Sequence, residues 1–347
     1  MTQLHQTTVI LLILIDGSNG GGQLVRTAAA LSTLTEKSFK MVNIRGARPN
    51  PGLKTQHIEA IKSLGKLCNA EVKGLKLYSQ ELEFYPKGLI EKDLKIKIST
   101  AGSIGLVLQA VMIATSKMKG IEIEIDGGGT WNKWAPPVLY LEKVLFPLMG
   151  EKSKIKIIKD GFYPKGGAKV KIQTKYLESK PIEIVERGEI VEICGHSVAS
   201  QNLKKAKVGE RQGKKAEELI KQKFNRYLKK EVKYVNSLSP GSGLLLCIKT
   251  ENSVIGADSL GKRGKKAEDV AKDAIKNLIF ENANGAVDRH TGDMLLPYMA
   301  LAGSGKIKTS KITHHILTNI SIIEKFLPVK FDVNKDERLI SCKTIRS

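Results

Sequence analysis

The sequence predicts an α/β protein, of α+β type, in which three repeated βαβαββ units form a large domain that carries a smaller inserted α/β domain. Three observations support this prediction. Short β-branched runs alternate with stretches of helical periodicity. The order strand–helix–strand–helix–strand–strand occurs twice before residue 175, and this period, more than residue identity, indicates a repeat. The composition changes near residue 183, and the earlier pattern returns near 282.

The first unit is expected over residues 8–90. It opens with the apolar run 9–15 (VILLILI), which predicts a buried strand and is too short to span a bilayer. Asp16-Gly17 then predicts a turn, in place of the small-residue cleavage site of a signal peptide. The remaining elements are predicted as helices at 23–35 and 55–68 and as strands at 39–44, 71–72, 76–78 and 82–85.

The second unit is expected over residues 91–178. One helix is predicted to open at 101–103 and to run to 116. Another is predicted to begin at Pro136-Pro137 and to run to 148, because proline is favoured in a first helical turn. Strands are predicted at 94–98, 121–125, 153–158 and 168–173, the last two joined by a turn with the sequence GFYPKGG.

The third unit is expected to combine residues 179–182 with 282–347, so that the large domain comprises 1–182 and 282–347. Its predicted elements are a helix from 287, a strand at 307–309, a helix at 319–326, and strands at 330–333 and 339–343. The insert, 183–281, has predicted strands at 189–194, 232–235, 244–248 and 254–257, a basic helical stretch at 204–231 and a helix at 265–280.

The charge balance favours a polyanionic partner. Lysine and arginine number 57 against 35 acidic residues, a formal charge of +22. Such a field attracts nucleic acid first and an anionic membrane surface second. The alternative is a lysine-rich surface that only keeps the protein in solution, and for the stretch 204–230 an RNA-guiding surface and a solvated helix face are both open.

The four cysteines are far apart and form no CxxC pair. They therefore predict neither a zinc site nor a disulfide framework, and they fit a reducing, cytoplasmic compartment.

Two loops have the composition of phosphate-binding segments. The first, DGSNGGGQ at 16–23, precedes a predicted helix, where backbone amides can cradle phosphate. It matches neither common nucleotide-binding fingerprint, so a tight strand-to-helix turn is the alternative. The second, IRGARPNPGLKTQH at 44–57, places Arg45 and Arg48 in a proline-rich turn, and guanidinium groups suit phosphate oxygens. A solvated basic loop is the alternative there.

Two further segments contain rings. GTWNKWAPP at 129–137 holds both tryptophans beside Lys133, which suits either base stacking or packing at a helix start. KITHHILTNI at 311–320 holds two of the six histidines. We expect a strand here, with His314 and His315 on opposite faces, so that only one of them serves a given site. A nucleophile or general base competes with an ordinary structural histidine.

Taken together, these stretches resemble the RNA 3′-terminal phosphate cyclases, and the similarity runs nearly end to end. The matching segments are DGS…GGGQLVRT at 16–27, IRGARPNPGLKTQH at 44–57, STAGSIGLVLQ at 99–109, GGT…APP at 128–137, GFYPKGG at 161–167, GDMLLPYMALAG at 292–303, and HILTN with EKFLP at 315–328. The insert matches poorly.

The resemblance implies an enzyme that uses ATP and a divalent metal, Mg or Mn, on RNA with a 3′-terminal phosphate. It implies that His315, which directly precedes the ILTN segment, takes AMP from ATP as a covalent histidine–AMP intermediate. The AMP then passes to the RNA 3′-phosphate, and the neighbouring ribose 2′-OH closes a 2′,3′-cyclic phosphate. The residues implied to bind phosphate or nucleotide are Gln23, Arg26, Arg45, Arg48, Gln56, His57, Gln109, Pro137 and Asp293.

Three positions depart from the family pattern. The glycine loop is two residues shorter than the usual DGSxGEGGGQ and lacks its Glu. Met294 stands where Gln often follows the acid, and Pro49-Asn50 replaces a common Lys. These departures keep a non-catalytic RNA-binding homologue, acting in RNA processing or ribosome assembly, as the alternative. A small-molecule enzyme of the enolpyruvyl-transferase type is a third hypothesis, and it needs no histidine nucleophile.

Overall fold

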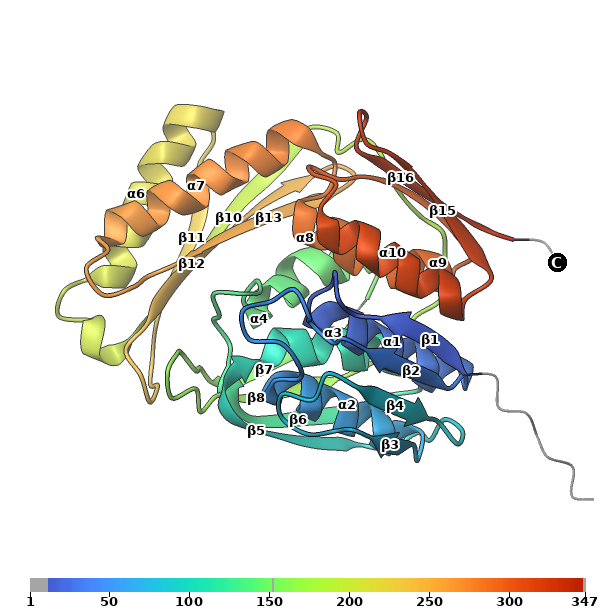
Figure 1. The fold of residues 1–347 in the computed structure, drawn as a ribbon. Helices are drawn as coiled ribbons and strands as arrows, with labels where there is room; N and C mark the ends of the chain where they lie inside the picture. The colour runs from blue at the N-terminus through green and yellow to red at the C-terminus, as the bar shows by residue number, and fades with distance from the viewer. Residues whose placement is uncertain (1–11, 152, 346–347) are drawn as a thin grey trace, which may run out of the picture.

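The structure is a computed structural model that describes residues 12–151 and 153–345. Its strands form four sheets, each with four strands of mixed direction, and helices pack against them (Figure 1). The mixed α/β class is therefore confirmed. Of the strand predicted at 9–15, residues 9–11 lie outside the described part. Within the described residues, no helix combines the length and the apolar character that a membrane span needs.

The first sheet has the order β1-β2-β4-β3, with β1 and β2 parallel and the other pairs antiparallel. The strand predicted at 76–78 is wrong, because Lys76 and Tyr78 lie in a turn where the Ser79 N–H donates to the Lys76 carbonyl at 3.2 Å. The elements are β1 (Ile13–Asp16), α1 (Gly22–Thr35), β2 (Phe39–Val42), α2 (Thr55–Leu67), β3 (Glu71–Lys73) and β4 (Leu82–Tyr85).

The second sheet has the order β5-β6-β8-β7, with β5 and β6 parallel. Its first strand continues to Ser103, and the helix predicted from 101 starts at Ile104. Ser103 caps this helix, because its side chain accepts the Leu106 N–H at 3.3 Å. The elements are β5 (Leu94–Ser103), α3 (Ile104–Thr115), β6 (Glu122–Gly129), α4 (Val138–Tyr140), a π-helical turn η1 (Leu141–Leu145), α5 (Phe146–Met149), β7 (Ile155–Lys159) and β8 (Lys169–Gln173).

The third sheet has the order β9-β14-β16-β15, with β9 and β14 parallel and the other pairs antiparallel. Its pairing order and strand directions are those of the first two sheets. β9 crosses the boundary expected between 182 and 183. The elements are β9 (Ile182–Ile184), α8 (Arg289–Met294), α9 (Leu296–Leu301), β14 (Ser304–Lys308), α10 (His314–Phe326), β15 (Val329–Asn334) and β16 (Leu339–Thr344).

The strand expected around the histidine pair is wrong, because His314 and His315 begin helix α10. The Thr313 side chain caps this helix by accepting the Ile316 N–H at 3.2 Å. Ile316, Ile320 and Ile323 are buried at helical spacing. The side chains of this segment that face the core are therefore those at helical spacing, and not every second one as in a strand.

The fourth sheet has the order β11-β10-β12-β13, and α6 and α7 cover one of its faces (Figure 1). It has a hydrophobic core of its own, in which Ile193, Ile220, Leu246 and Leu278 take part. The other three sheets and their helices share the main core. The elements are β10 (Ile190–Ser200), a 3₁₀ turn η2 (Gln201–Leu203), α6 (Val208–Phe224), β11 (Leu228–Val235), β12 (Ser242–Thr250), β13 (Val254–Leu260) and α7 (Ala267–Asn284).

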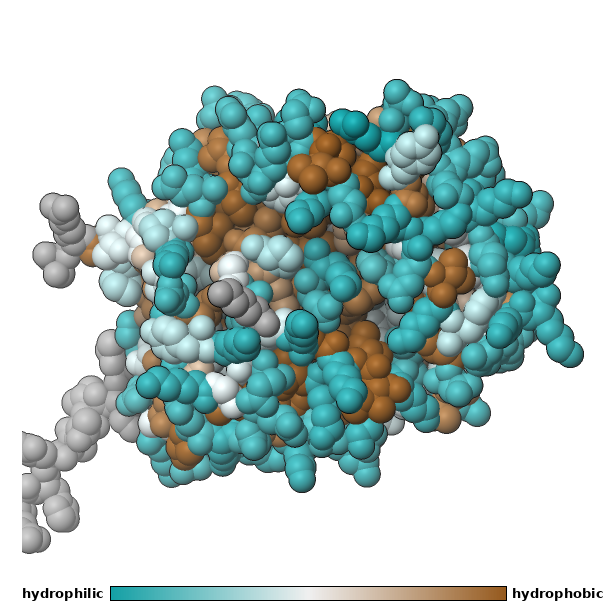
Figure 2. Space-filling view, turned by 180° about the vertical axis from the view of Figure 1, so that it is seen from behind, coloured by the Kyte–Doolittle hydropathy of each residue, from teal (hydrophilic) through white to brown (hydrophobic). Residues whose placement is uncertain are grey.

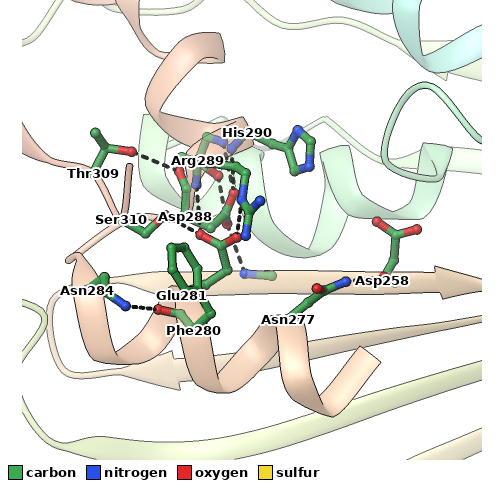
Figure 3. A network of polar contacts seen from close by, with 12 residues as sticks. Asp258, Asn277, Phe280, Glu281, Asn284, Asp288, Arg289, His290, Thr309 and Ser310 are labelled. Carbon is green, nitrogen blue, oxygen red and sulfur yellow. Dashed lines mark hydrogen bonds and ion pairs between the residues drawn. The ribbon is translucent and has the colours of Figure 1, made fainter. Parts of the chain in front are cut away.

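A buried carboxylate joins the fourth sheet to the rest of the molecule (Figure 3). Asp288 caps α8 by accepting the N–H groups of His290 and Thr291, each at 3.0 Å. The same carboxylate accepts the Tyr140 hydroxyl at 2.5 Å and the Gly256 N–H of β13 at 2.9 Å. Because it is fully buried and serves three elements, Asp288 fixes α8 between α4 and the fourth sheet.

The surface is predominantly hydrophilic on the face opposite to that of Figure 1, with hydrophobic side chains visible in separate patches between the polar ones (Figure 2). Part of the basic stretch 204–230 is paired: Arg211 contacts Glu268 at 2.8 Å, and Lys215 contacts Glu218 at 2.6 Å. The positive charge of this stretch is therefore partly balanced on the helix surface itself.

Candidate active site

His315 occupies the first turn of α10 and points away from the core. Ile316 and Ile320 take the buried positions of this helix, so the imidazole of His315 lies on its outer side. A Cβ atom on Gly21 would lie 3.3 Å from the Cε1 atom of His315 and 3.6 Å from the Nη2 atom of Arg48. The glycine loop, the arginine turn and the helix start therefore meet at one place.

A chain of hydrogen bonds links His315 to a carboxylate on another helix. The Nδ1 atom of His315 lies 2.5 Å from the Oε1 atom of Gln23 on α1. The Gln23 Nε2 atom donates to both carboxylate oxygens of Asp293 on α8, at 2.5 and 2.6 Å. The Asn319 amide, one turn beyond His315 on α10, donates to Asp293 Oδ1 at 3.1 Å. Three helices thus orient one imidazole.

This chain determines which imidazole nitrogen is free. An ionised carboxylate only accepts hydrogen bonds, so the NH₂ group of Gln23 faces Asp293 and its carbonyl oxygen faces His315. That oxygen also only accepts, so the proton of a neutral His315 ring resides on Nδ1. The lone pair is therefore on Nε2, and this nitrogen is the one able to act as a nucleophile or a base.

The surroundings keep His315 neutral. Partial burial lowers its pKa below the ordinary histidine value, and the positive charges of Arg48 and Arg26 lower it further. Burial raises the pKa of Asp293 to about 6, although its hydrogen bonds and Arg26 oppose that shift. Burial also lowers the pKa of Arg26 to about 10, so this guanidinium remains charged at neutral pH.

The start of α2 supports the glycine loop from behind. His57 is buried, and its Nδ1 atom accepts the Lys54 N–H at 3.1 Å. Its ring lies against Gly22, where an added Cβ atom would overlap the imidazole. Burial and the nearby charges of Arg26, Arg45 and Lys54 hold the pKa of His57 well below its usual range. His57 is therefore a neutral packing partner of the loop.

Two predicted residues make contacts inside the scaffold. Arg45, at φ +57°, donates from Nη1 to the carbonyls of Asn50 and Gly52, each at 2.8 Å, and so shapes its own turn. Gln56 accepts the Ser103 N–H at 2.9 Å through Oε1, and so links α2 to the end of β5. Arg48, by contrast, is exposed beside His315.

A cleft next to this chain of hydrogen bonds is lined by both polar and apolar side chains. Gln109 on α3 lines it, whereas Pro137 does not; Leu141 and Leu145, on the helix that Pro137 begins, do. The polar lining residues include Gln23, Arg26, Gln109, Asp293 and Asn319, and the apolar ones include Met112, Ile113 and Met294. Of the predicted residues, Gln23, Arg26, Gln109 and Asp293 therefore share one cleft.

Asn319 and His314 were not predicted as site residues. Asn319 lies within the ILTN segment, and its spacing of four residues from His315 is the signal that would have identified it once a helix is assumed. The Nε2 atom of His314 lies 2.5 Å from the Asn19 carbonyl oxygen, so this neighbouring histidine holds the glycine loop.

The described residues contain no group of three or more His, Cys, Asp or Glu side chains arranged to hold a metal ion. Asp16, the acidic residue of the glycine loop, accepts the Ser18 N–H at 3.0 Å and the Asn43 amide at 3.1 Å. Its carboxylate is thus occupied in bracing the turn. All four cysteines carry free thiols.

Comparison with known proteins points in one direction. The family model described as RNA 3′-terminal phosphate cyclase matches residues 18–333. The chain is 44% identical over 326 residues to an RNA 3′-terminal phosphate cyclase of Thermococcus gammatolerans, covering 92% of this chain and 93% of that protein. Proteins of the same description from Pyrococcus furiosus and Ignicoccus hospitalis are 43% and 41% identical, with 93% and 91% of this chain and 95% and 93% of those proteins covered.

Proposed function

The chain belongs to the RNA 3′-terminal phosphate cyclase family, and from this premise we propose that it is an ATP-dependent ligase that converts an RNA 3′-terminal phosphate into a 2′,3′-cyclic phosphate. The observation that carries the mechanism is the hydrogen-bonded chain from Asp293 through Gln23 to His315. It leaves an unprotonated Nε2 atom beside the glycine loop and Arg48.

The first step is attack of His315 Nε2 on the α-phosphorus of ATP. The N–P bond forms as the bond to the bridging oxygen breaks, and pyrophosphate leaves. Positive charge develops on the ring, and the Gln23 oxygen accepts the Nδ1–H that shares this charge. Asp293 orients Gln23, and its negative charge lies on the side of Gln23 that is remote from the ring.

The second and third steps need no new nucleophile from the protein. An oxygen of the RNA 3′-phosphate attacks the phosphorus of the histidine–AMP, and the P–N bond breaks. The ribose 2′-OH then attacks the activated 3′-phosphate, which releases AMP and closes the cyclic ester. Neutral His315 is restored, so its low pKa suits it both as nucleophile and as leaving group.

Cations near His315 offset the negative charge of the phosphates. We assign contact with the phosphates to Arg48, which is exposed at the site, and background charge to the buried Arg26. Arg45 and His57 act by shaping the loops that present these groups. We place the adenine near Pro137, over the helical turn whose Leu141 and Leu145 line the cleft.

A divalent ion, Mg or Mn, accompanies ATP in this proposal. The described residues offer no cage of three carboxylate, imidazole or thiolate ligands, so the ion would be held chiefly by phosphate oxygens, as Mg²⁺ is in many nucleotide sites. Such an ion would neutralise charge on the triphosphate.

We also propose a domain organisation. The like order of the first three sheets supports three repeated units, 8–90, 91–178, and 179–182 with 282–347, in one large domain. The separate core of the fourth sheet supports 183–281 as the inserted small α/β domain. The inclusion of residues 183–184 in β9 argues for moving that boundary two residues onward.

Incubation with ATP labelled at the α-phosphate tests the proposal. Wild-type protein should yield an acid-labile protein–AMP adduct, and His315→Ala should yield none. Gln23→Leu should slow adduct formation roughly 100-fold, because the imidazole loses its orientation. His196→Ala, a histidine of the fourth sheet, is the matched control and should form the adduct at the wild-type rate.

Absence of any adduct in wild-type protein with either Mg or Mn, together with salt-sensitive RNA binding, would contradict the enzyme proposal and favour the non-catalytic RNA-binding homologue. An adduct that persists in His315→Ala would contradict the assignment of the nucleophile.

A further inference from the structure

Two short hairpins project side by side from the second sheet. The first lies between β6 and α4 and is closed by a bridge between Asn132 and Ala135. The second lies between β7 and β8 and is closed by a bridge between Phe162 and Gly166. Both lie in the part of the molecule beneath the fourth sheet (Figure 1).

The bases of these hairpins are fastened to each other. The N–H groups of Thr130 and Trp131 both donate to the Gly161 carbonyl, at 3.0 and 3.4 Å. The Thr130 hydroxyl donates to the buried Asp160 carboxylate at 2.7 Å. Because backbone and side-chain bonds join them, the bases of the two hairpins are held in a fixed relation.

Each hairpin packs one aromatic ring into the core. Trp131 is 3% exposed, and its ring lies against Gly243 of β12. Phe162 is buried against Gly241, in the turn before the same strand. The fourth sheet thereby helps to fix both hairpins. Packing at a helix start, one of the two readings of the tryptophan segment, therefore holds for Trp131.

The other aromatic ring of each hairpin is presented to solvent. Trp134 is 80% exposed and Tyr163 is 79% exposed. Each tip also carries a lysine, and the Nζ atom of Lys133 lies 4.7 Å from the centre of the Trp134 ring. Lys165 follows Tyr163 by two residues in the second hairpin and is exposed. Exposed rings on rigid supports beside cations are the components of a stacking platform for single strands.

A chain of contacts through the end of β5 and the start of α2 connects the hairpins to the glycine loop. A Cβ atom on Gly166 would lie 3.0 Å from the Ala101 Cα atom, and one on Gly129 would lie 3.4 Å from the Ala101 carbonyl oxygen. Two residues on, the Ser103 N–H donates to Gln56 at the start of α2. The next residue, His57, packs against Gly22 of the glycine loop. The end of β5 is thus the structural link between the two hairpins and the loop beside His315.

We propose that Trp134 and Tyr163 form a binding surface for the unpaired nucleotides that precede the reacting RNA end. Their rings stack on bases, and Lys133 and Lys165 neutralise backbone phosphates. This inference rests on the proposed function for its substrate. Base faces become available only in single strands, so the surface fits an unpaired 3′ segment and not a duplex end.

Isolated rings favour RNA over a protein partner. A protein interface would need a contiguous, largely apolar patch. Here the two exposed rings stand on separate tips beside lysines. The formal charge of +22 also favours a polyanion.

Equilibrium binding of oligoribonucleotides tests the inference without requiring turnover. The probe is an unstructured 12-nucleotide RNA with a 3′-phosphate, compared with the same strand paired to its complement as a blunt duplex. Trp134→Ala with Tyr163→Ala should weaken binding of the single strand by at least 5-fold, and by up to about 150-fold for each ring that stacks. Binding of the duplex should not change, and Trp134→Phe, which keeps an aromatic ring, should retain most of the affinity that Trp134→Ala loses.

Tyr227→Ala is the matched control. Tyr227 is 84% exposed, and the Lys221 Nζ atom lies 4.9 Å from its ring centre. It immediately precedes β11, whose eight residues separate it by roughly 25 Å from the turn that follows this strand, beside the hairpins. This variant should bind the single strand as wild type does.

Several outcomes would overturn the inference. One is wild-type affinity of the double variant for the 12-nucleotide single strand, and another is an equal loss for single strand and duplex. Loss of self-association in the double variant with unchanged RNA affinity would instead show a protein interface. Formation of the AMP adduct without RNA should be unaffected in the double variant, so failure of the proposed function and failure of this surface are distinguishable.

Discussion

Gln23 is the residue on which the orientation of His315 depends most directly. Its amide has two ends of opposite hydrogen-bonding character, and the structure uses both, one on Asp293 and one on His315. The sequence resemblance implied both Gln23 and Asp293 as site residues, but it did not reveal that Gln23 lies between Asp293 and His315. Residues 270 positions apart in the chain meet only after the fold forms, so no local pattern encodes the contact.

The pH dependence of adenylylation follows from the lowered pKa of His315. In the proposed mechanism the neutral ring is the reactive form, so the rate should rise with pH and level off above a pKa that lies below 6.5. Arg48→Gln removes a neighbouring positive charge, makes protonation easier, and should move this acid limb to higher pH. NMR titration of His315 and the pH profile of kcat/KM for ATP measure the shift.

Arg226→Gln is the control for this change, since Arg226 is an exposed arginine on the fourth sheet's side of the molecule. An acid limb that stays in place in Arg48→Gln, or moves equally in Arg226→Gln, would contradict the assigned electrostatic coupling.

At the scale of elements, the approach of α1 to α2 depends on a missing side chain. Gly22 leaves the space that the His57 ring fills, and the glycine loop runs directly into this contact. The element boundaries of both helices were predicted nearly correctly from hydrophobic spacing. The close approach was not predicted, because periodicity indicates which face is apolar and says nothing of how near two helices come.

Two glycine substitutions should therefore shift stability in opposite directions. Gly22→Ala would place a methyl group within the His57 ring and should cost about 1–3 kcal/mol. Gly65→Ala, within α2, would meet the Val72 side chain at an ordinary 3.7 Å and should gain about 0.5–1 kcal/mol, because alanine is the better helix former. Thermal unfolding of the two variants measures this contrast, and a shift of the same sign in both would contradict the proposed steric cause.

The histidine pair shows where the sequence was insufficient. The alternation of apolar and polar residues in ITHHILT fits a strand. The same residues also fit the first turn of a helix capped by Thr313. Short segments leave this ambiguity open. Core burial of Ile316, Ile320 and Ile323 resolves it, and that burial is a tertiary property.

At the scale of the whole molecule, three sheets of like order surround one core, and the fourth sheet has a core of its own. The α/β class and most elements could be predicted from alternation and helical spacing. The turn at 76–78 could not be predicted in this way, because the residues there alternate as a strand would. The turn depends on positive φ angles at Gly74 and Tyr78, which the pattern does not reveal.

The positive charge of the molecule predicts a steep salt dependence for RNA binding. If a single strand contacts four phosphates, its affinity should fall roughly 50-fold between about 50 and about 200 mM salt. Adduct formation from ATP without RNA should change far less. Binding titrations across this range measure the slope, and a strand with uncharged methylphosphonate linkages is the control. A slope near zero for the natural strand would contradict a binding mode based on phosphate contacts.

The six residues of α8 have a mechanical consequence. Asp288, the N-cap of α8, accepts hydrogen bonds from the Tyr140 hydroxyl and the Gly256 N–H. Asp293, near the other end of α8, accepts hydrogen bonds from the Gln23 side chain. Along the helix axis, residues 288 and 293 are separated by a rise of about 7.5 Å. A displacement of the fourth sheet that kept the Gly256–Asp288 contact would also displace α8, and with it the Asp293–Gln23 pair that orients His315. Helix α8 is therefore one of the connections through which the position of the fourth sheet affects the orientation of the His315 imidazole.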